Sequence, residues 1–325
     1  MKSRLSKSCA VVALVFALHA SVFAQSLLAN KRVLWLGDSI TQIGDYVTFA
    51  EYDLEKQYPA NRFNIVSIGL ASETTSCLSE KTHPFPRPCV QERLERALTL
   101  VKPQVVVACY GMNDGIYHPQ SAERMKAFEQ GIEKVIAAAH AAGAQVVLLT
   151  PPPFDRLPVK NLASKGAADF GFMAPYEGYD SVLADYAHWE MQLPKSEATV
   201  IDLHTPIDAY LAERRKTEPD FTFAKKDGIH PDALGQLLMA QIVLQGLGVP
   251  VEDRDLEAEL AKIQADPLYA LIKKQREARS AGWLKYVGYT RGETVKSDSV
   301  VDVEKENAAL QGKVDALRKE ARQGF

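Results

Sequence analysis

The sequence has no marked excess of charge of either sign, and it has very little cysteine. Its 38 basic and 41 acidic residues leave a formal net charge of −3 over 325 residues, and only 4 residues are cysteine. Without a polycationic stretch, nucleic acid is not expected as a partner. The chain also lacks internal repeats and, beyond its first residues, any apolar run long enough to cross a bilayer. These absences leave an ordinary globular protein with material for one sizeable core.

The amino-terminal residues differ from the rest of the chain. Lys2, Arg4 and Lys7 form a positively charged segment, and an apolar run over residues 9–18 follows it. This layout predicts a secretory signal peptide that is cleaved after Ala24. An uncleaved membrane anchor is the alternative, but the run is short for a span of about 20 residues. We therefore expect a periplasmic or secreted protein without stable membrane insertion.

Export would place the remaining cysteines in an oxidising compartment. Cys77 and Cys89 flank a proline-rich loop at residues 83–88 and are placed to bridge across it. Cys109 sits in an apolar run and is expected to pack as a small buried hydrophobe. The count of three leaves at least one thiol free, or nothing bridged, and the spacing does not settle the disulfide connectivity.

Five short runs rich in β-branched residues alternate with helical patterns. The runs are continuously apolar, as is typical of strands covered on both faces. They lie at residues 32–36, 64–68, 104–110, 145–150 and 199–203. The helical patterns lie at about 46–57, 90–100, 121–142, 177–193, 205–216 and 232–247. This alternation predicts a three-layer α/β/α sandwich around a five-stranded parallel sheet.

The character of the chain changes after about residue 250. The remaining stretch is charged and mostly helical in pattern, with Trp283, Tyr286 and Tyr289 in a short aromatic cluster. Apolar positions at 303–322 predict one amphipathic helix, which packs on the main domain or pairs with a second copy, since it is short for a free-standing coiled coil. We expect a main domain at 25–250 and a helical C-terminal extension, with self-association through its helix left open.

Polar clusters directly follow the first three predicted strands. They are Gly-Asp-Ser at 37–39, residues 67–72, and Gly-Met-Asn-Asp at 111–114. In open parallel sheets, ligands bind outside the carboxyl ends of the strands. All three clusters are therefore expected at the same edge of the sheet.

Residues suited to acyl transfer fall in these clusters and on one later loop. Ser39 enters a helical turn at the end of a strand and is the candidate nucleophile, although serine is also a common helix N-cap there. Asp227 lies three residues before His230, so its carboxylate can orient the imidazole that accepts the Ser39 proton. A loop histidine with a local hydrogen bond is the alternative for His230. Asn113 can donate to an oxyanion or form an Asx-type turn, and both can hold together.

In order and spacing, these blocks resemble the GDSL (SGNH) hydrolase superfamily over roughly residues 30–247. The resemblance implies a flavodoxin-like sheet of order 2-1-3-4-5 and a serine esterase that needs no metal or organic cofactor. It implies Ser39 as nucleophile, His230 as general base and Asp227 as the orienting carboxylate. It further implies an oxyanion hole built from the backbone amides of Ser39 and Ser72 and the side chain of Asn113.

One block departs from the family pattern. The family places a glycine, whose amide joins the oxyanion hole, at the position of Ser72, and it has an asparagine at the position of Ser67. An amide is still present at Ser72, but glycine's freedom at positive φ is not. Gly69 is the alternative donor if the alignment shifts. In many members the residue matching Asp38 braces the nucleophile loop rather than reacting.

The surroundings of the blocks bear on the substrate. Residues with aromatic or hydrogen-bonding groups there are Tyr110, Tyr117, His118, Arg87 and the loop 83–88. Such groups fit sugar faces and hydroxyls as well as many other ligands. The segment 151–175 is expected to form a lid or wall over the cleft edge.

Export together with a GDSL-type site favours short acyl esters, such as acetyl groups, on a small carbohydrate or polysaccharide. The alternative is a lipid or thioester acyl hydrolase of the lysophospholipase kind. A non-catalytic carbohydrate-binding protein and a metallophosphoesterase are remote alternatives, the second because the several metal ligands it needs are missing from the strong blocks.

Overall fold

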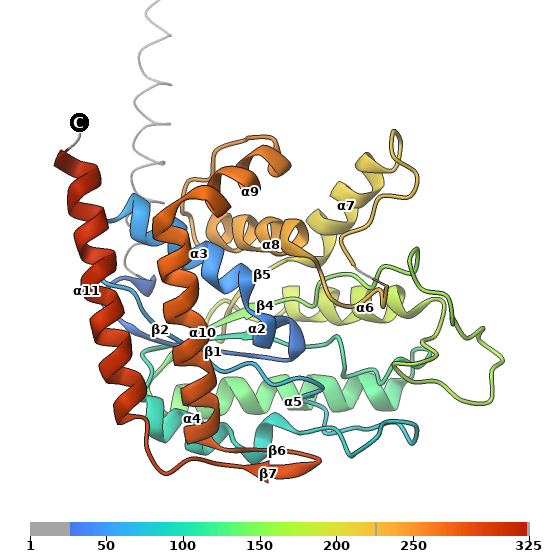
Figure 1. Cartoon of the computed structure of the whole chain (residues 1–325). Helices are drawn as coiled ribbons and strands as arrows, with labels where there is room; N and C mark the ends of the chain where they lie inside the picture. The colour runs from blue at the N-terminus through green and yellow to red at the C-terminus, as the bar shows by residue number, and fades with distance from the viewer. Residues whose placement is uncertain (1–26, 225, 324–325) are drawn as a thin grey trace, which may run out of the picture.

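A parallel sheet of five strands lies at the centre of the protein, of which this computed structural model describes residues 27–224 and 226–323 (Figure 1). The strands pair in the order β2-β1-β3-β4-β5, which confirms the predicted order. Their bounds are β1 (Arg32–Gly37), β2 (Asn64–Ser67), β3 (Val105–Cys109), β4 (Gln145–Leu149) and β5 (Thr199–Ile201). The expected signal peptide at 1–24 lies outside the described residues.

The strands β1 to β4 are mostly buried on both faces, as their continuous apolar runs predict. Every residue of β3 is buried. Val105 of β3 pairs with Val33 of β1, and Cys109 pairs with Gly37 at the other end of the two strands. Because β1 and β3 end level, the polar segments that follow them leave the sheet at the same edge.

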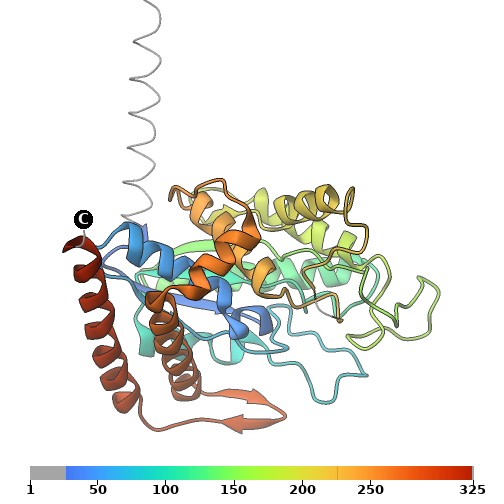
Figure 2. The same cartoon turned by 45° about the horizontal axis from the view of Figure 1, so that its top comes forward.

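Helices cover both faces of the sheet and complete the predicted three-layer sandwich (Figures 1 and 2). In this main part they are α2 (Ser39–Ile43), α3 (Asp45–Gln57), the 3₁₀ helix η1 (Val90–Glu92), α4 (Leu94–Val101), α5 (Ala122–Ala141), α6 (Tyr179–Met191), α7 (His204–Arg214) and α8 (Ala233–Gly246). Helices α3 and α8 pack together on one face, and α4 and α5 on the other. Phe128 of α5 stacks on Tyr186 of α6 with 4.2 Å between ring centroids, so α6 lies on the same face of the sheet as α5. No helix among the described residues has the length and apolarity of a bilayer span.

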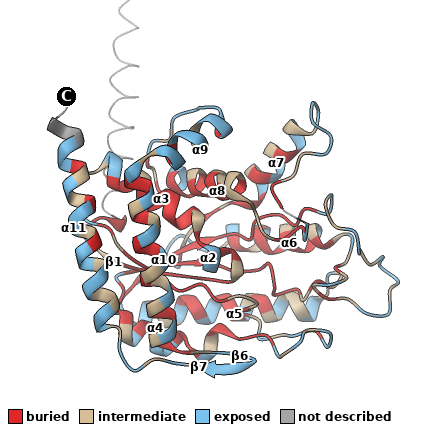
Figure 3. Ribbon diagram, viewed as in Figure 1, coloured by how far each residue is buried: buried red, intermediate tan, exposed pale blue. Residues whose placement is uncertain are grey.

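The C-terminal extension packs against the main core. It contains α9 (Leu256–Ala265), α10 (Pro267–Val287) and α11 (Val301–Gln323). Helix α10 lies along α3 and β2, and α11 lies on α10 (Figure 2). Leu310 and Val314 of α11 are buried within the chain, whereas the outer face of this helix is exposed (Figure 3). The predicted helix at 303–322 is therefore present and packs on its own chain. The domain boundary near 250 and self-association stay predictions.

A short antiparallel hairpin interrupts the extension and was not expected from the sequence. Strand β6 (Tyr289–Arg291) pairs with β7 (Glu293–Val295) across Gly292, whose φ of +75° suits glycine. Strands of three residues carry too little periodicity to be separated from the surrounding helical pattern. The guanidinium of Arg291 lies 5.9 Å from the ring centroid of Phe85, so the hairpin reaches the proline-rich loop.

Two arginines of α10 cover the free edge of β2. Arg276 and Arg279 donate to the carbonyl of Ile65 at 3.3 and 3.0 Å. Arg276 also pairs with Glu51 of α3, and Arg279 pairs with Glu304 of α11 at 2.8 Å. The edge strand thus has a backbone acceptor satisfied by side chains of the extension.

Candidate active site

Ser39 is the first residue of helix α2, directly beyond β1. The N-cap of this helix is Asp38, whose carboxylate accepts a hydrogen bond from the amide of Ile40 at 2.9 Å. Asp38 therefore takes the capping role that serine often has at such a junction. The Oγ of Ser39 lies instead 2.8 Å from Nε2 of His230.

Asp227 and His230 face α2 from one tight loop. Oδ1 of Asp227 accepts from the amides of Ile229 and His230 at 2.9 and 3.0 Å, and its Oδ2 lies 2.7 Å from Nδ1 of the imidazole. Gly228 between them has φ +72°, a conformation that favours glycine. The loop thus fixes the carboxylate and the ring to each other before any substrate binds.

The protonation of this pair follows from its contacts. Partial burial opposes ionisation of Asp227, but the hydrogen bonds from His230 and from the backbone outweigh it and lower the pKa of Asp227 to about 2. At neutral pH the carboxylate is only an acceptor, so Nδ1 of His230 carries the proton that it donates. Nε2 is then the acceptor for the hydroxyl of Ser39, which is the tautomer a general base needs.

Ser72 has a backbone conformation that glycine usually adopts. The amide of Glu73 donates to the carbonyl of Leu70 at 3.1 Å and closes a turn in which Ser72 has φ +71°. Positive φ at the third residue of a turn is typical of type II turns, where glycine is usual. Ser72 therefore adopts the left-handed backbone conformation at the position where the family pattern has glycine.

Gly69, the alternative position, meets a different constraint. A Cβ on it would lie 2.3 Å from the amide nitrogen of Gln42 and 2.5 Å from the carbonyl carbon of Thr41. The absence of a side chain therefore lets the chain leaving β2 pass directly against the backbone of α2.

Asn113 is buried between three loops, and its side chain contacts all of them. Its Nδ2 donates to the carbonyl of Glu73 at 3.2 Å and lies 3.4 Å from Oδ2 of Asp38. Its Oδ1 accepts from the hydroxyl of Tyr117 at 2.9 Å and from Nη1 of Arg87 at 3.0 Å. Two donors at Oδ1 fix which end of the amide faces the nucleophile loop.

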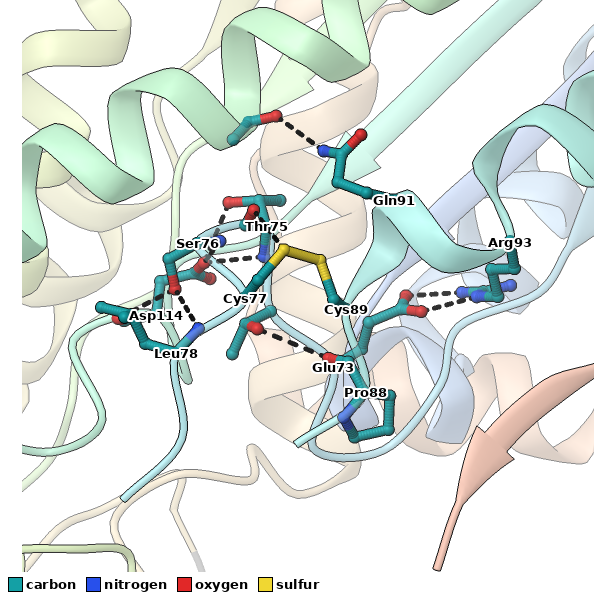
Figure 4. The surroundings of a disulfide bond; sticks show 12 residues. Glu73, Thr75, Ser76, Cys77, Leu78, Pro88, Cys89, Gln91, Arg93 and Asp114 are labelled. Carbon is teal, nitrogen blue, oxygen red and sulfur yellow. Dashed lines mark hydrogen bonds and ion pairs between the residues drawn. A yellow bond between two sulfur atoms is a disulfide. The ribbon is translucent and has the colours of Figure 1, made fainter. Parts of the chain in front are cut away.

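Asp114, the next residue, connects its loop to residues 75 and 76. This structural role was not predicted from the sequence. Its Oδ1 accepts from the amides of Thr75 and Ser76, both at 2.7 Å, and from the Thr75 hydroxyl at 2.9 Å (Figure 4). Its Oδ2 accepts from the amide of Gly111 at 3.0 Å. The Gly-Met-Asn-Asp motif drew attention to this position, but the motif alone does not indicate which residues Asp114 binds.

A disulfide between Cys77 and Cys89 closes the proline-rich loop, with 4.7 Å between the two Cα atoms (Figure 4). The structure thus gives the connectivity that spacing left open, and Cys109 is free and buried, as expected. The closed loop carries His83, whose Nε2 lies 3.3 Å from Oγ of Ser72, and it also carries Arg87.

The other residues considered from the sequence lie around this centre at different depths. Tyr110 donates to the buried carboxylate of Glu73 at 2.7 Å, so it supports the site rather than lining it. His118 stands against Phe170 with 5.3 Å between ring centroids. The segment expected as a wall touches the loop of Asp227, since the Asp155 amide donates to the carbonyl of residue 228 at 2.9 Å. In the described chain, no three His, Cys, Asp or Glu side chains are grouped to hold a metal ion.

Solved structures of other proteins share this three-layer α/β/α fold. A structure called BT4096, a gut microbial diltiazem-metabolizing enzyme, aligns with a TM-score of 0.52 and 19% identity over 68% of this chain. The alignment spans only 47% of that enzyme. Two mutants of Axe2 from Geobacillus stearothermophilus, one described as an acetyl-xylooligosaccharide esterase and one as an acetylxylan esterase, align at 18% identity over 70% of this chain. Their TM-scores are 0.52 and 0.50, and the alignments span 99% and 98% of their chains.

The sequence itself matches the GDSL-like lipase/acylhydrolase family over residues 35–238, which is more than half of the chain. No curated protein matches it in sequence. The chain therefore belongs to the GDSL-like lipase/acylhydrolase family, which confirms the resemblance found in its motifs. It is a carboxylic ester hydrolase.

Proposed function

We propose that this hydrolase cleaves esters through a catalytic triad of Ser39, His230 and Asp227. One observation carries the proposal: an unbroken relay of two hydrogen bonds, 2.8 Å from Ser39 to His230 and 2.7 Å from His230 to Asp227. It joins residues 191 positions apart in the sequence. A local hydrogen bond alone would account for the aspartate and the histidine, but not for the serine.

In the first step, Oγ of Ser39 attacks the acyl carbon while Nε2 of His230 accepts the hydroxyl proton. The negative charge that forms on the carbonyl oxygen is stabilised by hydrogen bonds from the amides of Ser39 and Ser72 and from Nδ2 of Asn113. As the intermediate collapses, His230 returns its proton to the departing alcohol and leaves an acyl-serine.

In the second step, water replaces the alcohol. His230 accepts a proton from the water, whose oxygen attacks the acyl carbon, and the same donors again hold the oxyanion. Collapse releases the carboxylic acid and returns the proton to Ser39. Asp227 stays ionised throughout and stabilises the imidazolium that forms in each half of the cycle.

For the substrate, we propose acetyl or other short acyl esters of carbohydrate. The triad is open to solvent, with 27% of the His230 side chain and 45% of the Asp227 side chain exposed, so the leaving alcohol can belong to a large molecule. The Axe2 structures, which share the fold, are named as an acetyl-xylooligosaccharide esterase and an acetylxylan esterase. A lipid hydrolase would need a longer apolar groove.

A fluorophosphonate probe tests the triad. Because it reacts with an activated serine, it should label the wild-type protein at Ser39 and leave Ser39→Ala unlabelled. Ser39→Ala and His230→Ala should each lose nearly all hydrolysis of p-nitrophenyl acetate while keeping the wild-type circular dichroism spectrum. Labelling that survives in Ser39→Ala would contradict the assignment.

A substrate panel tests the acyl and alcohol preferences separately. The acetate should be cleaved faster than p-nitrophenyl octanoate, and acetylated xylan or pectin should release acetate where lysophospholipid releases no fatty acid. Strong preference for the octanoate and for lysophospholipid would favour the lipid hydrolase instead.

We also propose export, with cleavage after residue 24. The disulfide between Cys77 and Cys89 supports it, because such bonds persist mainly in oxidising compartments. The mass of the protein recovered from a periplasmic or culture fraction should correspond to a chain beginning at residue 25. A full-length chain in the reducing compartment would contradict this.

A further inference from the structure

We propose that Arg87 is the positioning residue of the oxyanion hole: it holds Asn113 and the turn of Ser72 in the geometry that stabilises the transition state. The inference rests on the proposed function and goes beyond it, because neither the triad nor the family motifs assign a role to the proline-rich loop. Arg87 acts through other residues and does not touch the reacting atoms.

The guanidinium of Arg87 is itself rigidly held. Its Nε and Nη2 donate to the two carboxylate oxygens of Glu80, both at 2.6 Å. The exposed fraction of the Arg87 side chain is 2%, and that of Glu80 is 0%. The guanidinium carbon also lies 5.4 Å from the ring centroid of Tyr117. A planar fork bound at two points and packed on an aromatic ring has little freedom left, so its third nitrogen points in one direction.

That third nitrogen contacts two of the three residues that supply candidate donors of the oxyanion hole. Nη1 of Arg87 donates to Oδ1 of Asn113 at 3.0 Å and lies 3.4 Å from the carbonyl oxygen of Ser72. The first contact keeps Nδ2 of Asn113 turned toward the nucleophile loop, since a flipped amide would put its donor nitrogen against the guanidinium. The second contact holds a turn whose central residue lies in the left-handed region.

A positive charge at Oδ1 has an electronic consequence as well. A hydrogen bond from a cation to the amide oxygen draws electron density from the amide and strengthens its N–H groups as donors. Arg87 therefore improves Asn113 as an oxyanion donor as well as fixing its direction.

The position of Arg87 in the chain connects this geometry to two other parts of the fold. Arg87 and Glu80 both lie inside the loop closed by the disulfide of Cys77 and Cys89. Oε1 of Glu80 also accepts from the amide of Phe172, in the segment expected to form the wall of the cleft. The ion pair thus joins the disulfide loop, the wall and the oxyanion hole at one buried point.

The test compares Arg87→Gln and Arg87→Lys with the wild type on p-nitrophenyl acetate. Both variants should lose roughly tenfold to a hundredfold in kcat with little change in KM, because small misplacements of a catalytic group cost up to about 10²-fold. Lysine can keep an ion pair with Glu80 but cannot bind Glu80 at two points and Asn113 at a third. Should Arg87→Gln fail to fold, Arg87→Lys carries the same test.

A double-mutant cycle separates positioning from general stability. In an Asn113→Ala background, Arg87→Gln should cost clearly less in kcat than it does in the wild type, because Asn113, one of the two groups that it positions, is already gone. The matched control is Arg276→Gln, which also removes a buried arginine from a carboxylate, Glu51, but in the C-terminal extension. It should lower the melting temperature and leave kcat of the folded protein unchanged.

Wild-type kcat in folded Arg87→Gln, or an equal loss in both backgrounds, would overturn the role of Arg87 alone. A wild-type protein that hydrolyses no ester would overturn the proposed function, and this inference with it. The two failures are distinguishable because the wild-type rate is measured first.

Discussion

The side-chain nitrogen of Asn113 lies 3.4 Å from the carboxylate of Asp38, the residue that precedes the candidate nucleophile. Asp38 is 2% exposed, and burial raises its pKa to about 7, although the Ile40 amide and the nearby imidazole of His230 oppose the rise. A carboxyl group that titrates near neutrality therefore stands directly behind the reacting centre. Its charge acts on the donors of the oxyanion hole as well as on the stability of the fold.

The stability of the protein should depend on pH through Asp38. Between its unfolded pKa near 4 and its folded pKa of about 7, the folded state holds more protons than the unfolded state, so the free energy of unfolding falls as pH rises through this window. The slope from this one group is about 1.4 kcal/mol per pH unit. Asp38→Asn keeps an oxygen for the Ile40 amide but does not titrate. Urea unfolding at pH 4, 5, 6 and 7 should show the variant gaining on the wild type as pH rises, and a constant difference would contradict the shift.

Asn113→Ala should lower kcat by about 10²- to 10³-fold with little change in KM, the usual effect of losing one oxyanion donor. The measurement is steady-state hydrolysis of p-nitrophenyl acetate. Tyr117→Phe is the matched control, because it removes one hydrogen bond from Oδ1 of Asn113 and leaves the donor nitrogen in place. It should lose much less activity than Asn113→Ala. Equal losses in the two variants would show that the amide donor is not the important group.

Ser72→Gly and Ser72→Ala should both keep kcat within about threefold of the wild type, since each retains the backbone amide and a donor lost outright would cost about 10²- to 10³-fold. Glycine also relieves the strain of a residue at φ +71°. Both variants lose the contact between the Ser72 hydroxyl and His83, so comparing them isolates the backbone effect. A large loss in both would mean that the hydroxyl, rather than the amide, takes part in the reaction.

The double variant Cys77→Ser/Cys89→Ser should lower the free energy of unfolding by about 2–3 kcal/mol, because the disulfide closes a loop of modest length. Activity should fall as well, because Arg87 lies in that loop. Dithiothreitol should reduce the melting temperature of the wild type and leave that of the double variant unchanged. An equal effect on both proteins would assign the change to something other than this bond.

The strands of the sheet could be predicted, and the blocks that carry the candidate site residues could be recognised, because their signals are local. The five apolar residues at Val105–Cys109 are typical of a central strand that has a neighbour on each side. The order 2-1-3-4-5 came from the family resemblance. The three-residue spacing between Asp227 and His230 itself indicates that the two side chains can form a hydrogen bond. Each of these conclusions needed no knowledge of a distant partner.

The contacts that organise the site were not predictable for the opposite reason. Glu80 is an isolated acidic residue in a polar loop, and nothing nearby marks it as the buried partner of Arg87. The approach of Arg87 to Asn113 joins positions 26 residues apart, and its geometry depends on how two loops pack. The hairpin of β6 and β7 was not predicted because its strands are only three residues long, although Gly292 between residues with β-propensity was a usable sign of its turn.

The guanidinium groups of Arg276 and Arg279 affect how the edge strand β2 can interact with other protein chains. An uncovered border strand is a template on which another copy of the chain can add its own strand, and repeated addition leads to fibres or precipitates. Two cations seated on the Ile65 carbonyl block that docking at the point where β2 faces outward. The residues beyond 250 thus occupy a backbone acceptor of the edge strand that an added strand would otherwise use.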